Sequence, residues 1–358
     1  MDGIPEITIV SMAKGWGGAE EYLELFTREL ASRGIGYRII VRSGGEYAKR
    51  NDGRADIVAI PHSLTGLMRL AKNDPPPIRN RVIHVNRYYD IFRGWFLKRK
   101  IPGSILILYQ HCYLNHPNRL PLSLTEGILC ISEFVKSSLT KKYPSFEKKI
   151  QVINTAINTD VFHAKKNRYE TSGPVKIGMA GRFDKNQEEL LEIGGELKKR
   201  GIEIALHLAG EGAKDEERGL RALAKETGLD DDVVFHGNIP HAAMPSFYAD
   251  MDIMASTMRM EGLSLVAMEA MACGLPFVAY NVSGFRELID DGENGILVGG
   301  GREEFRKAIE GLIRSSEMRK RLGLKAAQKA NEDFGIERHV DRYLVFIEEL
   351  LRRKVGIS

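Results

Sequence analysis

Short apolar runs alternate with amphipathic segments along most of the chain. The first run, Glu6–Ser11, precedes a glycine-rich turn and a helical pattern that ends near Arg33, where Gly34 provides a stop. Six similar runs predict further strands, with helical segments between most of them: Tyr37–Val41, Ile57–Ile60, Val82–Val85, Ile105–Tyr109, Gly127–Ile131 and Ile150–Ile153. Apolar strands that alternate with helices are typical of a parallel sheet covered on both faces.

The same alternation starts again after a polar segment, residues 158–173, which we interpret as a linker. The second series predicts five strands and four helices: Val175–Ala180, Gln187–Arg200, Ile204–Ala209, Lys214–Thr227, Val233–His236, Met244–Ala249, Ile253–Ala255, Ser264–Ala272 and Phe277–Tyr280. Two such series predict an α/β fold of two Rossmann-like, doubly wound parallel-sheet domains facing a cleft, residues 1–165 and 170–335. The end of the chain, residues 335–358, is predicted to form an amphipathic helix that can pack back on either domain.

Composition narrows the class of protein. With 358 residues, of which 43% are hydrophobic and 28% charged, the chain is not collagen-like, disordered or a coiled coil. No apolar run approaches the roughly 20 residues of a membrane helix, and the N-terminal segment Met1–Glu6 is acidic where a signal peptide needs basic residues. Cys112, Cys130 and Cys273 fit neither a disulfide framework nor a zinc site. We therefore expect a cytoplasmic protein.

Charge is divided unevenly between the two halves of the chain. Residues 1–170 hold 26 Lys and Arg against 16 Asp and Glu, a net of +10, whereas residues 171–358 have a net of −6. The basic half suggests an anionic partner, such as the inner face of the cell membrane, or else a random distribution of surface charge. Within it, Arg87–Lys100 interleaves aromatics with cations and predicts either an interfacial helix on anionic lipid or a helix with its aromatics in the core. No nucleic-acid-binding motif accompanies the charge, so nucleic acid is not an expected partner.

The first segment with candidate functional residues is Met260–Pro276, where a loop follows a predicted strand and leads into a helix. The N–H groups of Leu263–Leu265 at that helix start favour phosphate oxygens or sugar hydroxyls. Glu261 precedes them, and Glu269 lies eight residues further on in an otherwise apolar helix. Because burying a carboxylate is costly unless it is paired, Glu269 is expected either to bind a ligand or to cap a neighbouring loop.

Two further segments follow predicted strands and open predicted helices. Arg182 and Lys185 place two cations at the carboxyl end of a strand, where they suit a diphosphate, although a solvated loop is the plain alternative. Gly17 and Gly18 follow the first strand, and their lack of side chains allows a ligand or the facing domain to approach the backbone. Neither the dinucleotide fingerprint G-x-G-x-x-G nor the phosphate-loop motif G-K-[ST] is present.

Together these segments resemble the retaining glycosyltransferases of family 4, the glycosyl transferases group 1, which have the GT-B fold. The resemblance rests on the Glu261…Glu269 pair, on Gly181-Arg182 with a following Lys, and on Gly17-Gly18-Ala19-Glu20. Further matches support it: His207–Gly212, Phe235–Ile239, Ser283–Ile289, Asn294–Val298, Cys130–Phe134 and Val152–Ala156. These matches are dense over residues 175–298 and looser over residues 35–125.

The resemblance implies a metal-independent, retaining transfer of a hexose-type sugar, with no cofactor, in the synthesis of a surface polysaccharide or glycolipid. A UDP- or GDP-sugar would bind the second domain, and a glycan or lipid-linked acceptor would bind the first. The groups implied in catalysis are Glu261, His111, Arg182 and Lys185, with a structural histidine as the alternative for His111. The implied donor contacts are Arg182, Lys185, Gly17 and Gly18 for the diphosphate, Glu269 for the ribose, Ile239 for the base, and Glu261, Gly262, Leu263, Ser264 and Leu265 for the sugar and phosphates.

Two features depart from the expected pattern. In many family members the basic partner follows the Arg by five residues, a place that Gln187 takes here, whereas Lys185 comes after three. Asp250-Met251-Asp252 spells the D-x-D metal motif of a different glycosyltransferase fold, but its apolar neighbours indicate a helix end entering a strand. Two other functions stay open: a nucleotide-sugar 2-epimerase of the same fold, and a non-catalytic nucleotide-sugar or glycan-binding scaffold at the membrane.

Overall fold

The structure, a computed structural model, describes residues 6–63, 65–66, 68, 82–115, 117–164, 169 and 173–355. It divides into two compact units, the first formed by residues 1–156 and 336–358 and the second by residues 157–335. The acidic N-terminal residues 1–5 and part of the predicted linker, residues 165–168 and 170–172, lie outside the described residues. Each unit is built around one parallel sheet, which confirms the predicted fold class.

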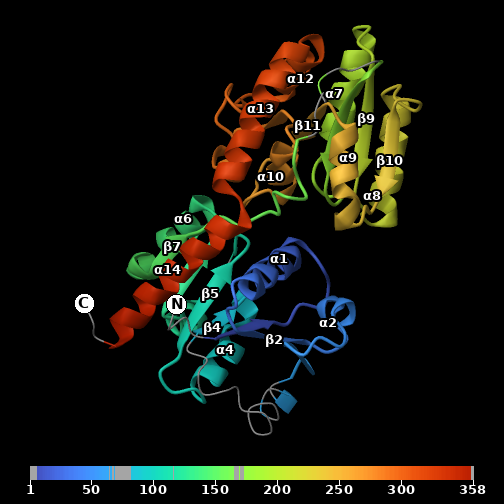
Figure 1. Cartoon of the computed structure of the whole chain (residues 1–358). Helices are drawn as coiled ribbons and strands as arrows, with labels where there is room; N and C mark the ends of the chain where they lie inside the picture. Colours follow the sequence, from blue (N-terminus) through green and yellow to red (C-terminus); the bar gives the residue numbers. More distant parts are fainter. Residues whose placement is uncertain are drawn as a thin grey trace. The chain divides into compact units, whose positions relative to one another are not determined.

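The first unit contains a seven-stranded parallel sheet in the order β3-β2-β1-β4-β5-β6-β7 (Figure 1). Its strands are β1 (Ile7–Ser11), β2 (Tyr37–Arg42), β3 (Ile57–Ile60), β4 (Val82–Val85), β5 (Ile105–Gln110), β6 (Gly127–Cys130) and β7 (Ile150–Val152). Strands β1, β4, β5 and β6 are buried along their whole length. Their apolar sequences follow from this position, because both faces of the sheet are covered.

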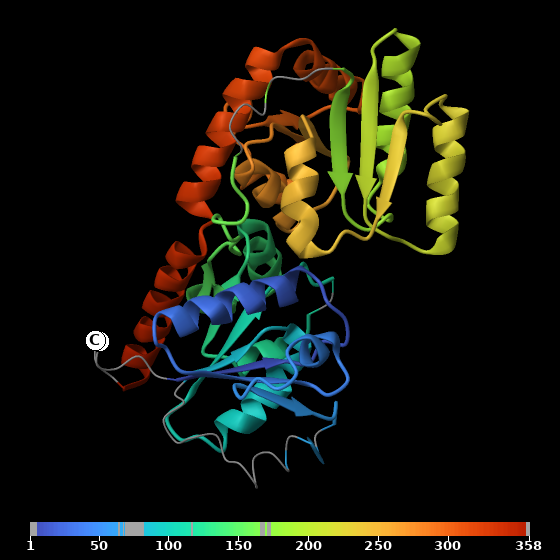
Figure 2. The ribbon, with the colours of Figure 1, turned by 45° about the vertical axis from the view of Figure 1, so that its right-hand side comes forward.

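Helices of the first unit come from both ends of the chain. The described ones are α1 (Gly18–Ser32), α2 (Glu46–Arg50), α4 (Ile91–Lys98), α5 (Arg119–Ser123), α6 (Glu133–Lys142) and α14 (Ile336–Val355), with short 3-10 turns at Tyr88–Asp90 and Pro144–Lys149. Helix α14, red in Figure 2, lies against α1, the long blue helix, where Tyr22 and His339 approach to 2.8 Å. The predicted C-terminal helix therefore belongs to the first unit.

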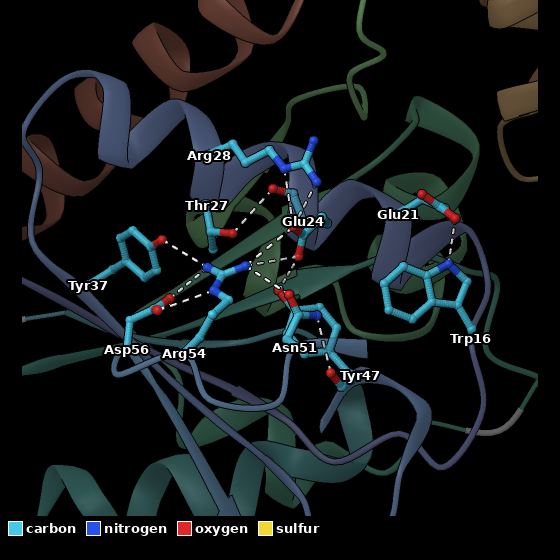
Figure 3. Close-up of polar contacts among 10 residues, drawn as sticks. All are labelled: Trp16, Glu21, Glu24, Thr27, Arg28, Tyr37, Tyr47, Asn51, Arg54 and Asp56. Atoms are coloured by element: carbon cyan, nitrogen blue, oxygen red, sulfur yellow. Dashed lines mark hydrogen bonds and ion pairs between the residues drawn. The ribbon is translucent and has the colours of Figure 1, made fainter. Parts of the chain in front are cut away.

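Arg54 joins several elements of the first unit (Figure 3). Its guanidinium donates to Asp56 at 2.7 Å and to Glu24 of α1 at 3.3 Å. It also donates to the hydroxyl of Tyr37 in β2 at 3.1 Å and to Asn51, which follows α2, at 2.9 Å. The network therefore fixes α1 and α2 against the first strands of the sheet.

The second unit contains a six-stranded parallel sheet in the order β10-β9-β8-β11-β12-β13. Its strands are β8 (Val175–Ala180), β9 (Ile204–Ala209), β10 (Val233–Gly237), β11 (Ile253–Ser256), β12 (Phe277–Tyr280) and β13 (Ile296–Val298). Its helices are α7 (Gln187–Lys199), α8 (Lys214–Glu226), α9 (Met244–Asp250), α10 (Leu265–Ala272), α11 (Ser283–Arg286), α12 (Arg302–Arg314) and α13 (Ser316–Asp333), with a 3-10 turn at His241–Ala243. Apolar residues of α7, α8 and α12 share one core with the sheet, and α9 lies in front of the strands in Figure 2.

The boundary between the units lies earlier than the predicted one. Residues 157–164 belong to the second unit and not to the first domain. The backbone N–H of Ile157 donates to the carbonyl of Phe334 at 2.9 Å, and Phe162 is buried beside His241 and Tyr248. The polar character of residues 158–173 suggested a linker, but the buried Phe162 anchors the start of this segment to the second unit.

Candidate active site

Each sheet has one point at which the connections leave in opposite directions. In the first unit this point lies between β1 and β4, and in the second it lies between β8 and β11. The loops after the carboxyl ends of such strands separate and leave room for a ligand. The residues implied by the family resemblance follow these strands and their neighbours, so each unit presents its own cluster of candidate residues.

In the second unit, the loop after β8 carries Arg182 and Lys185. Gly181 has a φ of 142°, which favours glycine, and a Cβ there would lie 3.0 Å from the Lys185 side chain. The Nζ of Lys185 lies 3.5 Å from Oε2 of Glu261, which follows β11. Arg182 is largely exposed and pairs with Asp184 at 2.9 Å. The structure therefore brings Lys185 and Glu261 together, whereas Arg182 contacts its own loop.

Glu261 is held at the start of the loop that leads into α10. Its Oε1 accepts a hydrogen bond from the N–H of Gly262 at 2.9 Å, and its carbonyl accepts one from the N–H of Gly284 at 3.1 Å. A Cβ at Gly284 would lie 2.6 Å from that carbonyl oxygen, so only glycine allows this close approach. Ser264 caps α10 by accepting from the N–H of Ala267 at 3.2 Å, and the helix begins at Leu265 as the pattern predicted within one residue.

Glu269 is buried in α10 and both its carboxylate oxygens have partners. His241 Nε2 lies 2.7 Å from Oε1, and the Tyr248 hydroxyl donates to Oε2 at 2.7 Å. Ile239, half-buried, comes two residues before His241. The pairing removes the cost of burying this carboxylate, and each oxygen keeps a second lone pair for a ligand hydroxyl. His241 and Tyr248 lie far from Glu269 in sequence, and the motif gave no signal for either residue.

In the first unit, Gly17 precedes α1 and Gly18 begins it. Gly17 is extended, with a φ of −167°, and a Cβ there would meet only the Glu20 side chain at 3.8 Å. Neither backbone conformation nor packing requires glycine at this position. By contrast, a Cβ at Gly210 in the second unit would lie 1.9 Å from the carbonyl oxygen of Gly181. A glycine that its own chain does not need fits a place where a ligand approaches the backbone.

Trp16 fastens the same loop to its surroundings (Figure 3). Its indole N–H donates to Glu21 at 2.5 Å, and its ring stacks on Tyr47 with the centroids 5.6 Å apart. The guanidinium of Arg50 lies 4.1 Å from the centre of the indole ring. The loop before α1 is thus held on α2 although it has no regular secondary structure.

His111 follows β5 and contacts the end of β4. Its Nε2 lies 2.8 Å from Oδ1 of Asn86, whose Nδ2 donates to the carbonyl of Ala19 at 3.3 Å. Because Asn86 uses its oxygen toward the imidazole, the ring proton is on Nε2 and Nδ1 carries the lone pair. Burial lowers the pKa of His111 well below its ordinary value, so the ring is neutral at pH 7. Asn86 is a neighbour of His111 that sequence reasoning missed.

Two family models match adjoining parts of the chain. The model for glycosyl transferases group 1 matches residues 161–329, and the model for glycosyltransferase family 4 matches residues 16–161. An uncharacterized glycosyltransferase of Haemophilus influenzae is 30% identical over 249 residues, which cover 66% of this chain and 68% of that protein. The chain belongs to the glycosyl transferases of group 1.

This chain is also similar to other known proteins in sequence or in structure. A GDP-mannose-dependent alpha-(1-6)-phosphatidylinositol monomannoside mannosyltransferase of Mycolicibacterium smegmatis is 25% identical over 325 residues, 79% of this chain and 82% of that protein. The crystal structure of Anabaena HepE in complex with UDP and glucose covers 97% of this chain and 100% of its own, with a TM-score of 0.81 and 18% identity. The glycosyltransferase therefore has the GT-B fold that the resemblance of its sequence to this family implies.

The D-x-D segment of this glycosyltransferase lies at the amino ends of the strands of the second sheet, away from the candidate residues. Asp250 ends α9 and pairs with the Lys176 side chain at 2.6 Å, and Asp252 accepts the backbone N–H of Lys176 at 2.8 Å. Lys176 is near the amino end of β8, whereas Lys185 and Glu261 follow carboxyl ends. Both aspartates therefore fix the start of the sheet. No group of three or more His, Cys, Asp or Glu side chains in the described ranges could hold a metal ion.

The aromatic and basic segment of the glycosyltransferase divides between core and surface. Ile91 and Leu97 of α4 are buried, and a Cβ at Gly94 would collide with Val85 and Leu106 side chains, so α4 packs closely on β4 and β5. By contrast, Tyr89, in the 3-10 turn before α4, is 77% exposed, and Phe92 of α4 is 48% exposed. Arg99 and Lys100, just after α4, are exposed as well. Within the described part of the chain, no helix has the length and apolarity needed to cross a bilayer.

Proposed function

We propose that this glycosyltransferase transfers a hexose-type sugar from a UDP- or GDP-sugar to a glycan or a lipid-linked acceptor, with retention of configuration and without a metal ion, and releases UDP or GDP. The observation that carries the proposal is the meeting of Lys185 and Glu261 at the switch point of the second sheet, 3.5 Å apart. These groups come from loops after different strands, and such convergence at a switch point is typical of a ligand site. The relatives support the donor class, since their names include GDP-mannose and their structures include UDP.

The residues then divide the work of binding and catalysis. Breaking the bond between the sugar and the diphosphate develops negative charge on the leaving phosphate. Lys185 and Arg182 stabilise that charge, which is the task a metal ion performs elsewhere, and Arg182 leaves Asp184 to do so. Glu261 and the start of α10, from Gly262 to Leu265, contact the sugar and phosphates. Each preorganised donor of this kind contributes roughly 3–4 kcal/mol to a comparable transition state.

The remaining candidates bind the rest of the donor or the reacting sugar. Glu269 accepts the ribose hydroxyls on the lone pairs that His241 and Tyr248 leave free, and Ile239 lies against the base. Gly17 and Gly18 of the first unit receive the diphosphate at their backbone. His111 addresses the sugar through the neutral ring that Asn86 orients.

The first experiment measures thermal stabilisation by UDP, GDP, ADP and dTDP, each with and without EDTA. A ligand at a hundred times its dissociation constant stabilises the folded state by about 2.7 kcal/mol, so the donor nucleotide is expected to stand out. One nucleotide should give a clear shift that EDTA does not change. Loss of the shift in EDTA would contradict the metal-independent reaction, and no shift with any nucleotide would contradict the donor class.

Turnover of the matching nucleotide sugars separates the enzyme from the alternatives. Glu261→Gln is expected to lower kcat by at least tenfold while the nucleoside diphosphate still binds. Tight donor binding by the wild type without transfer or hydrolysis would favour a scaffold, and interconversion of the sugar at C2 would favour an epimerase. Analysis of the anomeric configuration of the product tests retention directly.

Exposed residues in and beside α4 support a peripheral position on an anionic membrane. Tyr89, in the turn before α4, and Phe92 of α4 supply aromatic area, and Arg99 and Lys100, just after the helix, supply charge that attracts acidic headgroups. The protein is expected to sediment with vesicles containing phosphatidylglycerol and not with phosphatidylcholine vesicles. Tyr89→Ser with Phe92→Ser should abolish sedimentation, whereas Leu324→Ser, an equally apolar site that is 53% exposed in α13, should leave it unchanged. Equal binding by the double variant would argue against this surface.

A further inference from the structure

Asn186, between Lys185 and α7, has an unusual backbone. It is the one non-glycine residue among the described ranges with a positive φ, with φ 63° and ψ 37°. Asn tolerates this left-handed region better than most residues but still adopts it infrequently. Asn186 occupies the N-cap of α7, yet its side chain makes no capping hydrogen bond. Helix capping therefore does not explain this residue.

The Asn186 side chain instead joins the two loops of the candidate donor site. Its Nδ2 donates to the carbonyl of Thr257, which follows β11, at 2.8 Å and to Oε2 of Glu189 at 2.6 Å. The hydroxyl of the fully buried Thr257 donates back to the carbonyl of Asn186 at 2.5 Å. The loop that carries Lys185 is thus bonded in both directions to the loop that carries Glu261.

Glu189 collects further contacts at the same place. Its Oε1 accepts from the Tyr280 hydroxyl at 2.5 Å and from the Arg259 guanidinium at 2.8 Å. That guanidinium also lies 3.5 Å from the centre of the Tyr280 ring. The Glu189 side chain is only 12% exposed, so these bonds act with little competition from water. Arg259 lies two residues before Glu261, and the cluster therefore reaches both candidate loops.

The buried side chain of Gln187 also holds the loop that carries Arg182 and Lys185. Its side chain accepts from the N–H of Lys185 at 3.0 Å and donates to the carbonyl of Arg182 at 2.6 Å. Both ends of the cationic loop are fixed by this amide. The position that would carry a cation in a longer loop here shapes the backbone that presents Lys185.

We propose that Asn186, Glu189 and Thr257 are positioning residues that hold Lys185 against the donor diphosphate. The inference rests on the proposed function, because Lys185 is assigned to the diphosphate there. Asn186 turns the chain so that Lys185 faces Glu261, Thr257 locks that turn to the second loop, and Glu189 binds the Asn186 amide together with Arg259 and Tyr280. None of the three positioning residues contacts the reacting atoms itself.

The test compares nucleoside diphosphate with nucleoside monophosphate binding by calorimetry, for UDP and UMP and for GDP and GMP. Asn186→Ala, Glu189→Gln and Thr257→Val are each expected to weaken diphosphate binding at least fivefold and to change monophosphate binding less than twofold. Asn186→Gly keeps the left-handed turn but loses the tether, so it should fall between Asn186→Ala and the wild type. Glu188→Gln, the exposed neighbour on α7, is the matched control and should bind like the wild type.

The outcomes separate the inference from the proposed function. If the wild type prefers the diphosphate and folded Glu189→Gln and Thr257→Val keep that preference, the positioning role is wrong while the donor assignment stands. If the wild type binds no nucleotide, the proposed function fails and the inference fails with it. An equal loss of both affinities in every variant would show general damage to the unit and would also overturn the positioning role. Circular dichroism and melting curves of each variant identify any that do not fold.

Discussion

Lys185 is the residue on which the proposed donor site depends most directly. The family pattern leads one to expect a cation two residues later, but Gln187 is buried there and Lys185 approaches Glu261 instead. Lys185→Met is expected to raise the dissociation constant of the nucleoside diphosphate roughly 10- to 100-fold, since a charge-assisted hydrogen bond contributes about 1.5–3 kcal/mol. Calorimetric titration measures this change. Lys199→Met, at the exposed end of α7, should bind normally, and a normal titration for Lys185→Met would refute the assignment.

Gly17 and Gly210 offer a contrast between a glycine proposed to contact a ligand and a glycine that the fold itself requires. The open space at Gly17 predicts that Gly17→Ala keeps the melting temperature within about 1 °C and lowers kcat/KM at least tenfold, because the methyl group meets ligand and not protein. Gly210→Ala is expected to destabilise the second unit by at least about 1 kcal/mol, since its φ is 140° and its Cβ would collide with Gly181. Melting curves and steady-state kinetics of both variants decide the matter. Full activity of Gly17→Ala would contradict close ligand approach there.

Among the elements, the apolar strands and their helices were predictable because continuous burial leaves a strong sequence pattern. Strands such as Ile57–Ile60, Val175–Ala180 and Phe277–Tyr280 have the predicted bounds. Strand β13 (Ile296–Val298) was missed since three residues at a sheet edge give no periodic signal, and α12 and α13 were not predicted. The residues around the candidate site could not be predicted from the sequence in the same way. Asn86 approaches His111, and His241 approaches Glu269, because the fold brings them together and not because of their sequence spacing.

Helix α14 shows how one element completes a unit from a distance in sequence. Phe346 and Leu350 lie so close to Gly127 that a Cβ there would be 2.5 Å from each side chain. Phe346→Ala is expected to destabilise the first unit by roughly 3–5 kcal/mol through the cavity that it leaves. Both tryptophans, Trp16 and Trp95, belong to the first unit, so their fluorescence in urea reports its unfolding. Val345→Ala, which alters a 55% exposed neighbour, is the control, and equal midpoints for the two variants would count against this role of α14.

At the scale of the whole molecule, the chain leaves the first unit after residue 156, forms the second, and returns at residue 336. His339, near the start of the returning helix, lies 2.8 Å from the carbonyl of Asn154 through Nδ1 and 2.8 Å from the Tyr22 hydroxyl through Nε2. His84 lies 3.1 Å from the Tyr343 hydroxyl in the same core. The junction between the two separated segments of the first unit is therefore lined by buried, neutral imidazoles.

Those imidazoles make the stability of the first unit depend on pH. Burial lowers the pKa of His339 to about 4 and that of His84 to about 3, whereas both ordinarily titrate near 6.5. The unfolded chain therefore binds more protons below pH 6.5, so the unfolding free energy is fully present above that pH and falls as pH decreases toward 4. For His339 the loss amounts to about 3 kcal/mol.

Urea titrations between pH 7 and pH 4.5, followed by tryptophan fluorescence, measure this dependence in the first unit alone. His339→Gln is expected to be less stable at pH 7 and to show a shallower slope with pH, because one buried titrating group is gone. His163→Gln, which replaces an exposed imidazole, should keep the wild-type slope. The slope, and not the stability at one pH, distinguishes titration of the junction from ordinary loss of packing; parallel slopes for His339→Gln and the wild type would exclude this residue as a source of the acid sensitivity.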